Sequence, residues 1–221
     1  MIEKNKTYAI GDLHGNFKAL KRVLKKWHFR NEADRLIFLG DLADGHSHPD
    51  KCLLRLLEIE DLIPIIGNHD LFLKKWLDRG IIDERWKKLG AKHTIDALYD
   101  YKPELKEYFS KAVYYHVQDG MIFTHGGFNH KRLITKQRKL NFAINRNMYR
   151  TSKQYARQNI KFKPIFDEKN SVEIDCIFIG HSPTENYLPA FNSNLINLDT
   201  GAGNGGKLTM MDIYSKKYVQ S

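Results

Sequence analysis

The chain has 221 residues, of which 42% are hydrophobic and 28% charged, a balance typical of a globular protein and not of a disordered chain. Its formal net charge of +10 favours anionic partners such as nucleic acids, phosphoproteins or nucleotides. Lysine-rich helices are, however, often no more than solvated surfaces, so the charge alone selects no partner.

Targeting signals are weak or lacking in the sequence. No apolar run approaches the roughly 18 to 20 residues of a membrane span, and the polar leader Glu3 to Thr7 lacks the apolar stretch of a signal peptide. The two cysteines, Cys52 and Cys176, have no spacing typical of a metal clip or a disulfide framework. We therefore expect buried free thiols, a cytoplasmic location and no membrane partner.

Apolar runs and segments with helical spacing alternate in the first part of the chain. In order, they are residues 8–10, 16–28, 36–39, 50–60 and 62–66, each apolar run being a predicted strand. Their order predicts a parallel sheet with right-handed crossovers. Pro64 indicates that the third strand lies at an edge or is irregular.

The pattern changes in the second part. Residues 71–109 are mostly helical, which predicts either a cap at about 71–111 beside the site or a simple cover for the sheet. Residues 112–117 and 121–124 predict paired strands around a tight turn. A basic insert at about 128–171 carries aromatic residues that suit packing or nucleobase stacking. Later strands are expected at 176–179, 187–191, 195–198, 207–213 and 217–220, forming a second mixed or antiparallel sheet within a single domain, 1–221.

Five apolar runs end in a glycine beside a residue type that binds hard metals. The candidate ligands are Asp12, His14, Asp41, Asn68, His125 and His181. Ligands bind at the carboxyl ends of strands in an α/β sheet, so we expect these side chains along one edge. Carboxylate, imidazole and amide oxygen suit Mn, Fe or Zn, and six groups are too many for one ion that keeps an open position. Two metals bridged by a carboxylate fit the count, which indicates phosphoester hydrolysis.

The motifs containing these residues resemble those of the calcineurin-like metallophosphoesterases. The match is to the phosphoprotein phosphatase branch, which includes small bacterial and phage serine/threonine phosphatases, and symmetrical diadenosine tetraphosphate hydrolases share the motifs. The resemblance implies a four-layer α/β/β/α sandwich of two mixed β-sheets, which belongs to the α/β class. It also implies that Asp12 and His14 bind the first metal, that Asp41 bridges, and that Asn68, His125 and His181 bind the second.

Further roles follow from the same resemblance. His69 matches the family's general acid, Asp44 the carboxylate that orients it, and Asn68 and Arg146 would contact the substrate phosphoryl group. An imidazole beside a carboxylate stays protonated to higher pH, as an acid for an alkoxide leaving group requires. The alternative for His69 is a supporting hydrogen bond at the metal site.

One position departs from the family pattern. Gly45 stands where the family has an arginine that grips phosphoryl oxygens. Arg146 resembles the second family arginine, with Arg150 as the other candidate, and both could instead be surface residues. His46, His48 or a lysine of the basic insert could replace the missing cation. The loss weakens the prediction of a phosphomonoester substrate more than that of a diester.

Three hypotheses remain open from the sequence. The first is a serine/threonine protein phosphatase that uses a dimetal-bound hydroxide without a phosphoenzyme. The second is a hydrolase of nucleotide or nucleic-acid phosphoesters, of the dinucleoside tetraphosphatase or phosphodiesterase type. The third is a non-catalytic phosphate-binding module. Two divalent metals are expected, with Mn preferred and Fe or Zn as alternatives.

Overall fold

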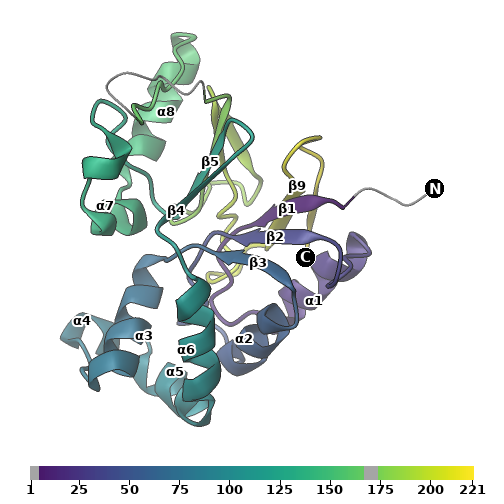
Figure 1. Ribbon diagram of the computed structural model, residues 1–221, viewed down its shortest axis with the longest axis vertical. Coiled ribbons are helices and arrows are strands. Elements are labelled where there is room, and N and C mark those ends of the chain that lie inside the picture. The colour runs from purple at the N-terminus through teal and green to yellow at the C-terminus, as the bar shows by residue number, and fades with distance from the viewer. Residues whose placement is uncertain (1–4, 167–173) are drawn as a thin grey trace.

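Two β-sheets pack face to face, and helices cover both outer faces (Figure 1). The computed structural model describes residues 5–166 and 174–221, so Glu3 and Lys4 of the polar leader and residues 167–171 of the basic insert lie outside it. The arrangement is the predicted four-layer α/β/β/α sandwich of two mixed sheets.

The first sheet has the strand order β10-β9-β1-β2-β3. Its parallel strands are the three predicted from the first part of the chain, namely β1 (Thr7–Ile10), β2 (Arg35–Phe38) and β3 (Asp61–Pro64). Strand β3 lies at the edge of the sheet, as predicted from Pro64. Proline has no N–H to donate, and an edge strand has a side on which none is needed.

The last two strands also belong to the first sheet. Strand β9 (Thr209–Asp212) runs antiparallel to β1, and β10 (Tyr218–Gln220) pairs with β9. The prediction that they join the second sheet is wrong. Met210 and Met211 are both fully buried, on opposite faces of β9, so this strand must be covered on both sides, as it is beside β1.

The second sheet has the order β4-β5-β6-β8-β7. Its strands are β4 (Tyr115–Gln118), β5 (Met121–Thr124), β6 (Cys176–Ile179), β7 (Ala190–Asn192) and β8 (Leu195–Asn197). Strands β5, β6 and β8 are parallel, whereas β4 and β7 are antiparallel edge strands. The predicted tight turn between β4 and β5 is present, with Asp119 and Gly120 both at positive φ.

Helices form the two outer layers. Those over the first sheet are α1 (Phe17–Lys26), α2 (Pro49–Leu57), α3 (Asn68–Arg79), α4 (Glu84–Lys87), α5 (Ala91–Leu98) and α6 (Lys102–Lys111), with the 3-10 turn η1 (Tyr99–Tyr101). Those over the second are α7 (Lys139–Ile144) and α8 (Asn147–Arg157), preceded by the 3-10 turn η2 (Ile134–Lys136). The Asn16 side chain caps α1 by accepting from the N–H of Ala19 at 3.1 Å.

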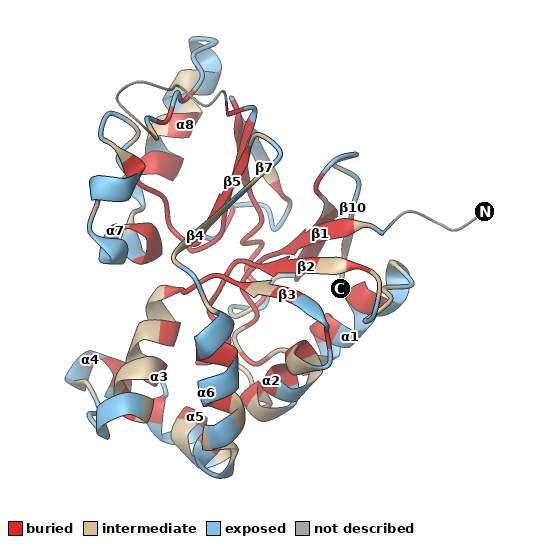
Figure 2. Ribbon diagram, in the orientation of Figure 1, coloured by how far each residue is buried: buried red, intermediate tan, exposed pale blue. Residues whose placement is uncertain are grey.

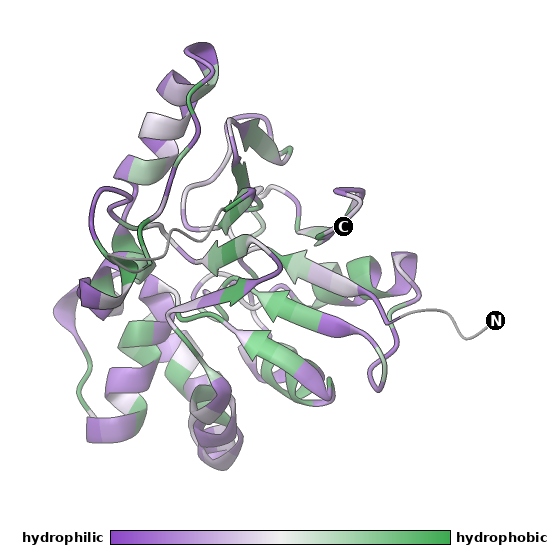
Figure 3. Cartoon of the chain, turned by 45° about the horizontal axis from the view of Figure 1, so that its top comes forward, coloured by the Kyte–Doolittle hydropathy of each residue, from purple (hydrophilic) through white to green (hydrophobic). Residues whose placement is uncertain are grey.

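Three apolar layers hold the sandwich together. Side chains alternate along a strand, so Ile122 and Ile177 pack under α7 and α8 while Phe123 and Phe178 face the first sheet. The central strands are mostly hydrophobic, whereas the helices alternate hydrophobic and hydrophilic residues (Figure 3), and the buried residues lie mainly on the central strands and on the inner sides of the helices (Figure 2). Both cysteines are buried and free, and no helix in the described residues is long and apolar enough to cross a membrane.

The layer between the sheets predicts a stability difference between two phenylalanines. Phe178 is fully buried and stacks on Phe123 with a centroid distance of 4.8 Å, whereas Phe191 on β7 is 52% exposed. We expect Phe178→Ala to lower the free energy of unfolding by about 3 to 5 kcal/mol, and Phe191→Ala to change it by roughly 0.5 kcal/mol or less. Chemical denaturation measures both, and equal losses would contradict the proposed layer.

Candidate metal centre

The predicted ligands converge where the parallel strands of both sheets end. Loops after β1 and β2 carry Asp12, His14 and Asp41, Asn68 begins helix α3 after β3, and loops after β5 and β6 carry His125 and His181. A cavity of about 300 Å³ opens at this edge. Its lining includes all of these side chains except His125, together with His69, Asp44, Arg146 and Asp199.

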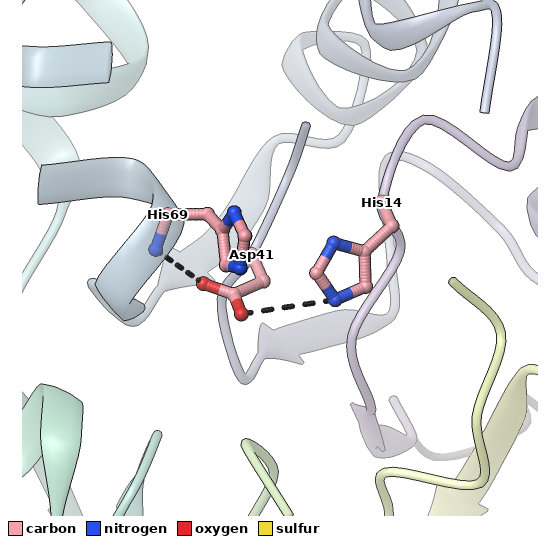
Figure 4. Close-up of side chains that lie close together, drawn as sticks. All are labelled: His14, Asp41 and His69. Atoms are coloured by element: carbon pink, nitrogen blue, oxygen red, sulfur yellow. Dashed lines mark hydrogen bonds and ion pairs between the residues drawn. The ribbon is translucent and has the colours of Figure 1, made fainter. Parts of the chain in front are cut away.

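Asp41 lies at the middle of the centre. Potential ligand atoms of His14, Asp41 and His69 lie within 4.8 Å of one another, and so do those of Asp41, His125 and His181. His14 Nε2 is 3.8 Å and His125 Nε2 is 3.3 Å from Asp41 Oδ2, while the backbone N–H of His69 donates to Asp41 Oδ1 (Figure 4). One carboxylate shared by two groups is what a bridging ligand requires.

The histidine rings are oriented by backbone groups. Nδ1 of His14 lies 3.0 Å from the carbonyl oxygen of Ala43, and Nδ1 of His125 lies 2.7 Å from that of Leu39. A neutral ring that donates from Nδ1 leaves Nε2 free for a metal. His181 instead offers Nδ1, which is buried and has no hydrogen-bond partner among the described residues. These donors fit divalent metal ions.

Asn68 and Asp12 complete the predicted set. Asn68 Oδ1 is 3.2 Å from His125 Nε2, on the side of the second group. The Asp12 carboxylate accepts from the backbone N–H of His181 at 3.0 Å. In the first group the third close donor is His69 and not Asp12. The individual ligand roles therefore stay predictions.

Charge is concentrated in this centre. Burial raises the pKa of Asp12, and the neighbouring carboxylates Asp199 and Asp41 raise it further. Burial also disfavours the charged form of Asp41, but the His125 imidazole lowers the pKa of Asp41. Although burial favours a neutral ring, Asp41 and Asp12 raise the pKa of His125 to about 10. Buried carboxylates packed this closely favour a bound cation, which fits the candidate metal site.

Asp70 supports the centre, and the sequence reasoning assigned it no role. It is fully buried, and its carboxylate accepts from the backbone N–H groups of Asp41 at 2.8 Å, Leu42 at 3.0 Å and Gly67 at 2.9 Å. It thus ties the loop after β2 to the start of α3. The available signal was an acidic residue in the first turn of a helix, a common capping position.

Four site residues have left-handed backbone conformations, at φ angles that non-glycine residues rarely adopt. They are His14 (47°), Asp41 (60°), Asp44 (69°) and His181 (67°). Such positions cluster at functional sites because the surrounding structure must hold them.

His69 and Asp44 form the predicted pair, with His69 Nδ1 2.8 Å from Asp44 Oδ2. Burial alone would lower the pKa of His69. The hydrogen bond to Asp44 and the charges of Asp41 and Asp44 outweigh it and raise this pKa above its ordinary value. The ring therefore keeps its proton to a higher pH than an unperturbed imidazole does.

The backbone of Gly45 lies close to His14. A Cβ at Gly45 would lie 2.9 Å from His14 Cβ, and one at Gly203 would lie 2.5 Å from His14 Cδ2. Both glycines lie against His14, so an arginine at position 45 would require His14 to shift. Of the candidate replacements, His46 bonds the carbonyl of Ala202 at 2.7 Å. Arg146, the candidate for the second family arginine, lines the cavity.

The fold and this centre are those of a metallophosphoesterase. The sequence profile of the calcineurin-like phosphoesterase family matches residues 6–205, and the chain belongs to this family.

Individual proteins with similar sequences or structures include nucleotide hydrolases and a protein phosphatase. A symmetrical bis(5'-nucleosyl)-tetraphosphatase from Pseudomonas entomophila is 33% identical over 129 residues, which are 55% of this chain and 42% of that protein. The chain thus spans less than half of this curated relative. A structure of a protein proposed to be a diadenosine tetraphosphatase matches with a TM-score of 0.68 and 16% identity, covering 100% of this chain and 94% of the other. A serine/threonine phosphatase from Saccharomyces cerevisiae matches with 0.61 and 12% identity, covering 100% and 80%. At these identities the two structures support the fold alone.

The shared carboxylate predicts how metal binding responds to mutation. Isothermal titration with Mn²⁺ should give two sites in the unmodified protein. Asp41→Asn should weaken both by roughly 10-fold or more, whereas His125→Gln should mainly weaken one. Asp100→Asn, an exposed carboxylate on η1, is the control and should bind as the unmodified protein does. Two unchanged sites in Asp41→Asn would rule out the bridge.

Proposed function

We propose that the protein hydrolyses a phosphoester or phosphoanhydride bond of a nucleotide, of the dinucleoside polyphosphate type, using two divalent metals. The observation that carries this choice is the likeness to the symmetrical bis(5'-nucleosyl)-tetraphosphatase, joined to a site able to hold two metals around Asp41. It gives preference to the nucleotide hydrolase over the serine/threonine phosphatase also inferred from the sequence.

The residues of the cavity would have three roles: metal binding, proton transfer and binding of the phosphoryl oxygens. Asp12, His14 and Asp41 would hold one metal, and Asp41, Asn68, His125 and His181 the other. Bound metals of this kind polarise phosphoryl oxygens and supply a nucleophile at neutral pH. His69 would hold a proton at its Nε2 for the departing oxygen, Asp44 would keep the ring in place, and Asn68 and Arg146 would bind the phosphoryl oxygens.

Positively charged side chains also line a hollow next to the metal cavity. A second hollow of about 200 Å³ shares Arg146 and Pro183 with the first and is also lined by Arg150 and Lys153, so the two are neighbours. Arg146, the N-cap residue of α8, and Arg150 and Lys153 within that helix follow one another at helical spacing and so lie on one face. Lys153 pairs with Glu185 at 2.8 Å, but Arg146 and Arg150 have no ion pair with any described residue. A substrate with several phosphates matches this run better than a single phosphoseryl group does.

The serine/threonine phosphatase remains the second candidate, and the likeness to the yeast phosphatase supports only its fold. The +10 charge supports a nucleic-acid phosphoester equally in principle, but the described cations lie in a hollow beside the centre. Manganese remains the proposed metal.

A substrate panel tests the proposed function. With Mn²⁺ we expect diadenosine tetraphosphate to be cleaved with a larger kcat/KM than a phosphoserine peptide, p-nitrophenyl phosphate or bis-p-nitrophenyl phosphate, and a chelator to abolish all turnover. Chromatography of the nucleotides and release of p-nitrophenol measure these rates. Faster turnover of the phosphopeptide would return the assignment to a protein phosphatase, and no turnover of any substrate would favour the binding module.

The run of cations predicts a graded effect on the nucleotide. Arg146→Ala should lower kcat/KM for diadenosine tetraphosphate by about 10- to 100-fold, because a charge-assisted contact to phosphate is lost. Arg150→Ala should act mainly through KM, and less strongly on p-nitrophenyl phosphate, which is too short to reach it. Arg132→Ala, an exposed arginine outside both hollows, is the control. Equal losses on both substrates for Arg150→Ala would contradict a second phosphate contact.

A further inference from the structure

We propose that Trp86 and Thr94 are positioning residues that fix the Asp44 carboxylate and, through it, the ring of His69. The inference rests on the role of His69 in the proposed function, and it assigns a task to helices α4 and α5, which cover the first sheet.

Both oxygens of Asp44 are held by side chains. Oδ2 accepts from His69 Nδ1 at 2.8 Å and from Trp86 Nε1 at 2.7 Å, and Oδ1 accepts from Thr94 Oγ1 at 2.5 Å. The Asp44 side chain is only 1% exposed, so water does not compete for these contacts. An ionised carboxylate is purely an acceptor, and three donors arranged around it match that state.

The two added donors restrict rotation of the carboxylate. A carboxylate bonded only to His69 could turn about its Cβ–Cγ bond and carry the imidazole with it. Trp86 from α4 and Thr94 from α5 approach from a different part of the chain and remove that freedom. A catalytic side chain must be held within about 0.5 Å of its working geometry, which requires such support.

Aromatic packing holds Trp86 in turn. Trp86 is fully buried and stacks on Phe72 with a centroid distance of 6.2 Å and an interplanar angle of 8°. Phe72 meets the edge of the His69 ring at 6.4 Å. Trp86 is thus linked to His69 indirectly in two ways: both bond to Asp44, and both pack on Phe72. Thr94 is 1% exposed, and its hydroxyl donates a hydrogen bond to Asp44 in addition to the packing of its side chain.

The opposing explanation is that a buried indole N–H and a buried hydroxyl need some acceptor, and that Asp44 only satisfies them. Leaving-group dependence separates the two explanations. Phenyl phosphate needs a proton on its departing oxygen far more than p-nitrophenyl phosphate does, so a displaced acid harms the first substrate selectively. General loss of folding or metal would reduce both equally.

The experiment compares Thr94→Val, which keeps the shape and removes the donor, with Thr94→Ser, which keeps the donor. Trp86→Phe removes the indole N–H, and Trp76→Phe, a buried tryptophan of α3 that does not touch Asp44, is its matched control. We expect Thr94→Val and Trp86→Phe to raise the kcat/KM ratio of p-nitrophenyl to phenyl phosphate by about 10-fold, in the same direction as His69→Asn. Thr94→Ser and Trp76→Phe should keep the original ratio.

A second measurement does not depend on turnover. The His69 Nδ1–H proton should give a downfield NMR signal, identified by its disappearance in His69→Asn, and this signal should shift or broaden in Thr94→Val and Trp86→Phe. If His69→Asn changes the substrate ratio while these variants do not, positioning is overturned and the acid stands. If His69→Asn leaves the ratio unchanged, the acid assignment fails, and an unshifted signal in both variants would overturn positioning as well.

Discussion

Burial of the Asp41 carboxylate is the constraint on which the centre depends. This side chain lies where the carboxyl ends of the parallel strands of both sheets meet. His14 and His69, which follow strands of the first sheet, lie on one side, and His125 and His181, which follow strands of the second, lie on the other. A buried anion is stable only with opposite charge and hydrogen bonds around it. Asp41 has both, because imidazoles flank it and Asp70 fixes the backbone that presents it. The two sheets must therefore pack in the observed register for this residue to be tolerated.

The helical layer over the first sheet extends this constraint outward. Asp44, three residues after Asp41, lines the same cavity and accepts hydrogen bonds from Trp86 of α4 and Thr94 of α5. Three side chains thus bond to the Asp44 carboxylate, namely His69 of α3, Trp86 of α4 and Thr94 of α5. The face of the centre that would meet the substrate is built from both helical layers, since Arg146 precedes α8 on the other side.

Much of this was predictable from local pattern. The glycine-flanked motifs indicated the six candidate ligands, because strand ends carry such residues and parallel strands share one edge, and the family resemblance added His69. Trp86 and Thr94 were not predictable as partners of Asp44, since they lie more than 40 residues away and an indole N–H has no sequence signature. The placement of β9 in the first sheet was missed for a related reason: two consecutive buried methionines show that both faces are covered but not which sheet covers them.

The left-handed backbone at four site residues sets a limit on how stable this protein can become. Each of these positions would be relieved by glycine, which adopts such φ angles without a steric penalty, by about 1 kcal/mol or more. A glycine at any of them would remove this strain together with the side chain that the proposed centre uses. Contacts elsewhere in the fold, including its three apolar layers, must therefore offset the strain at these four positions.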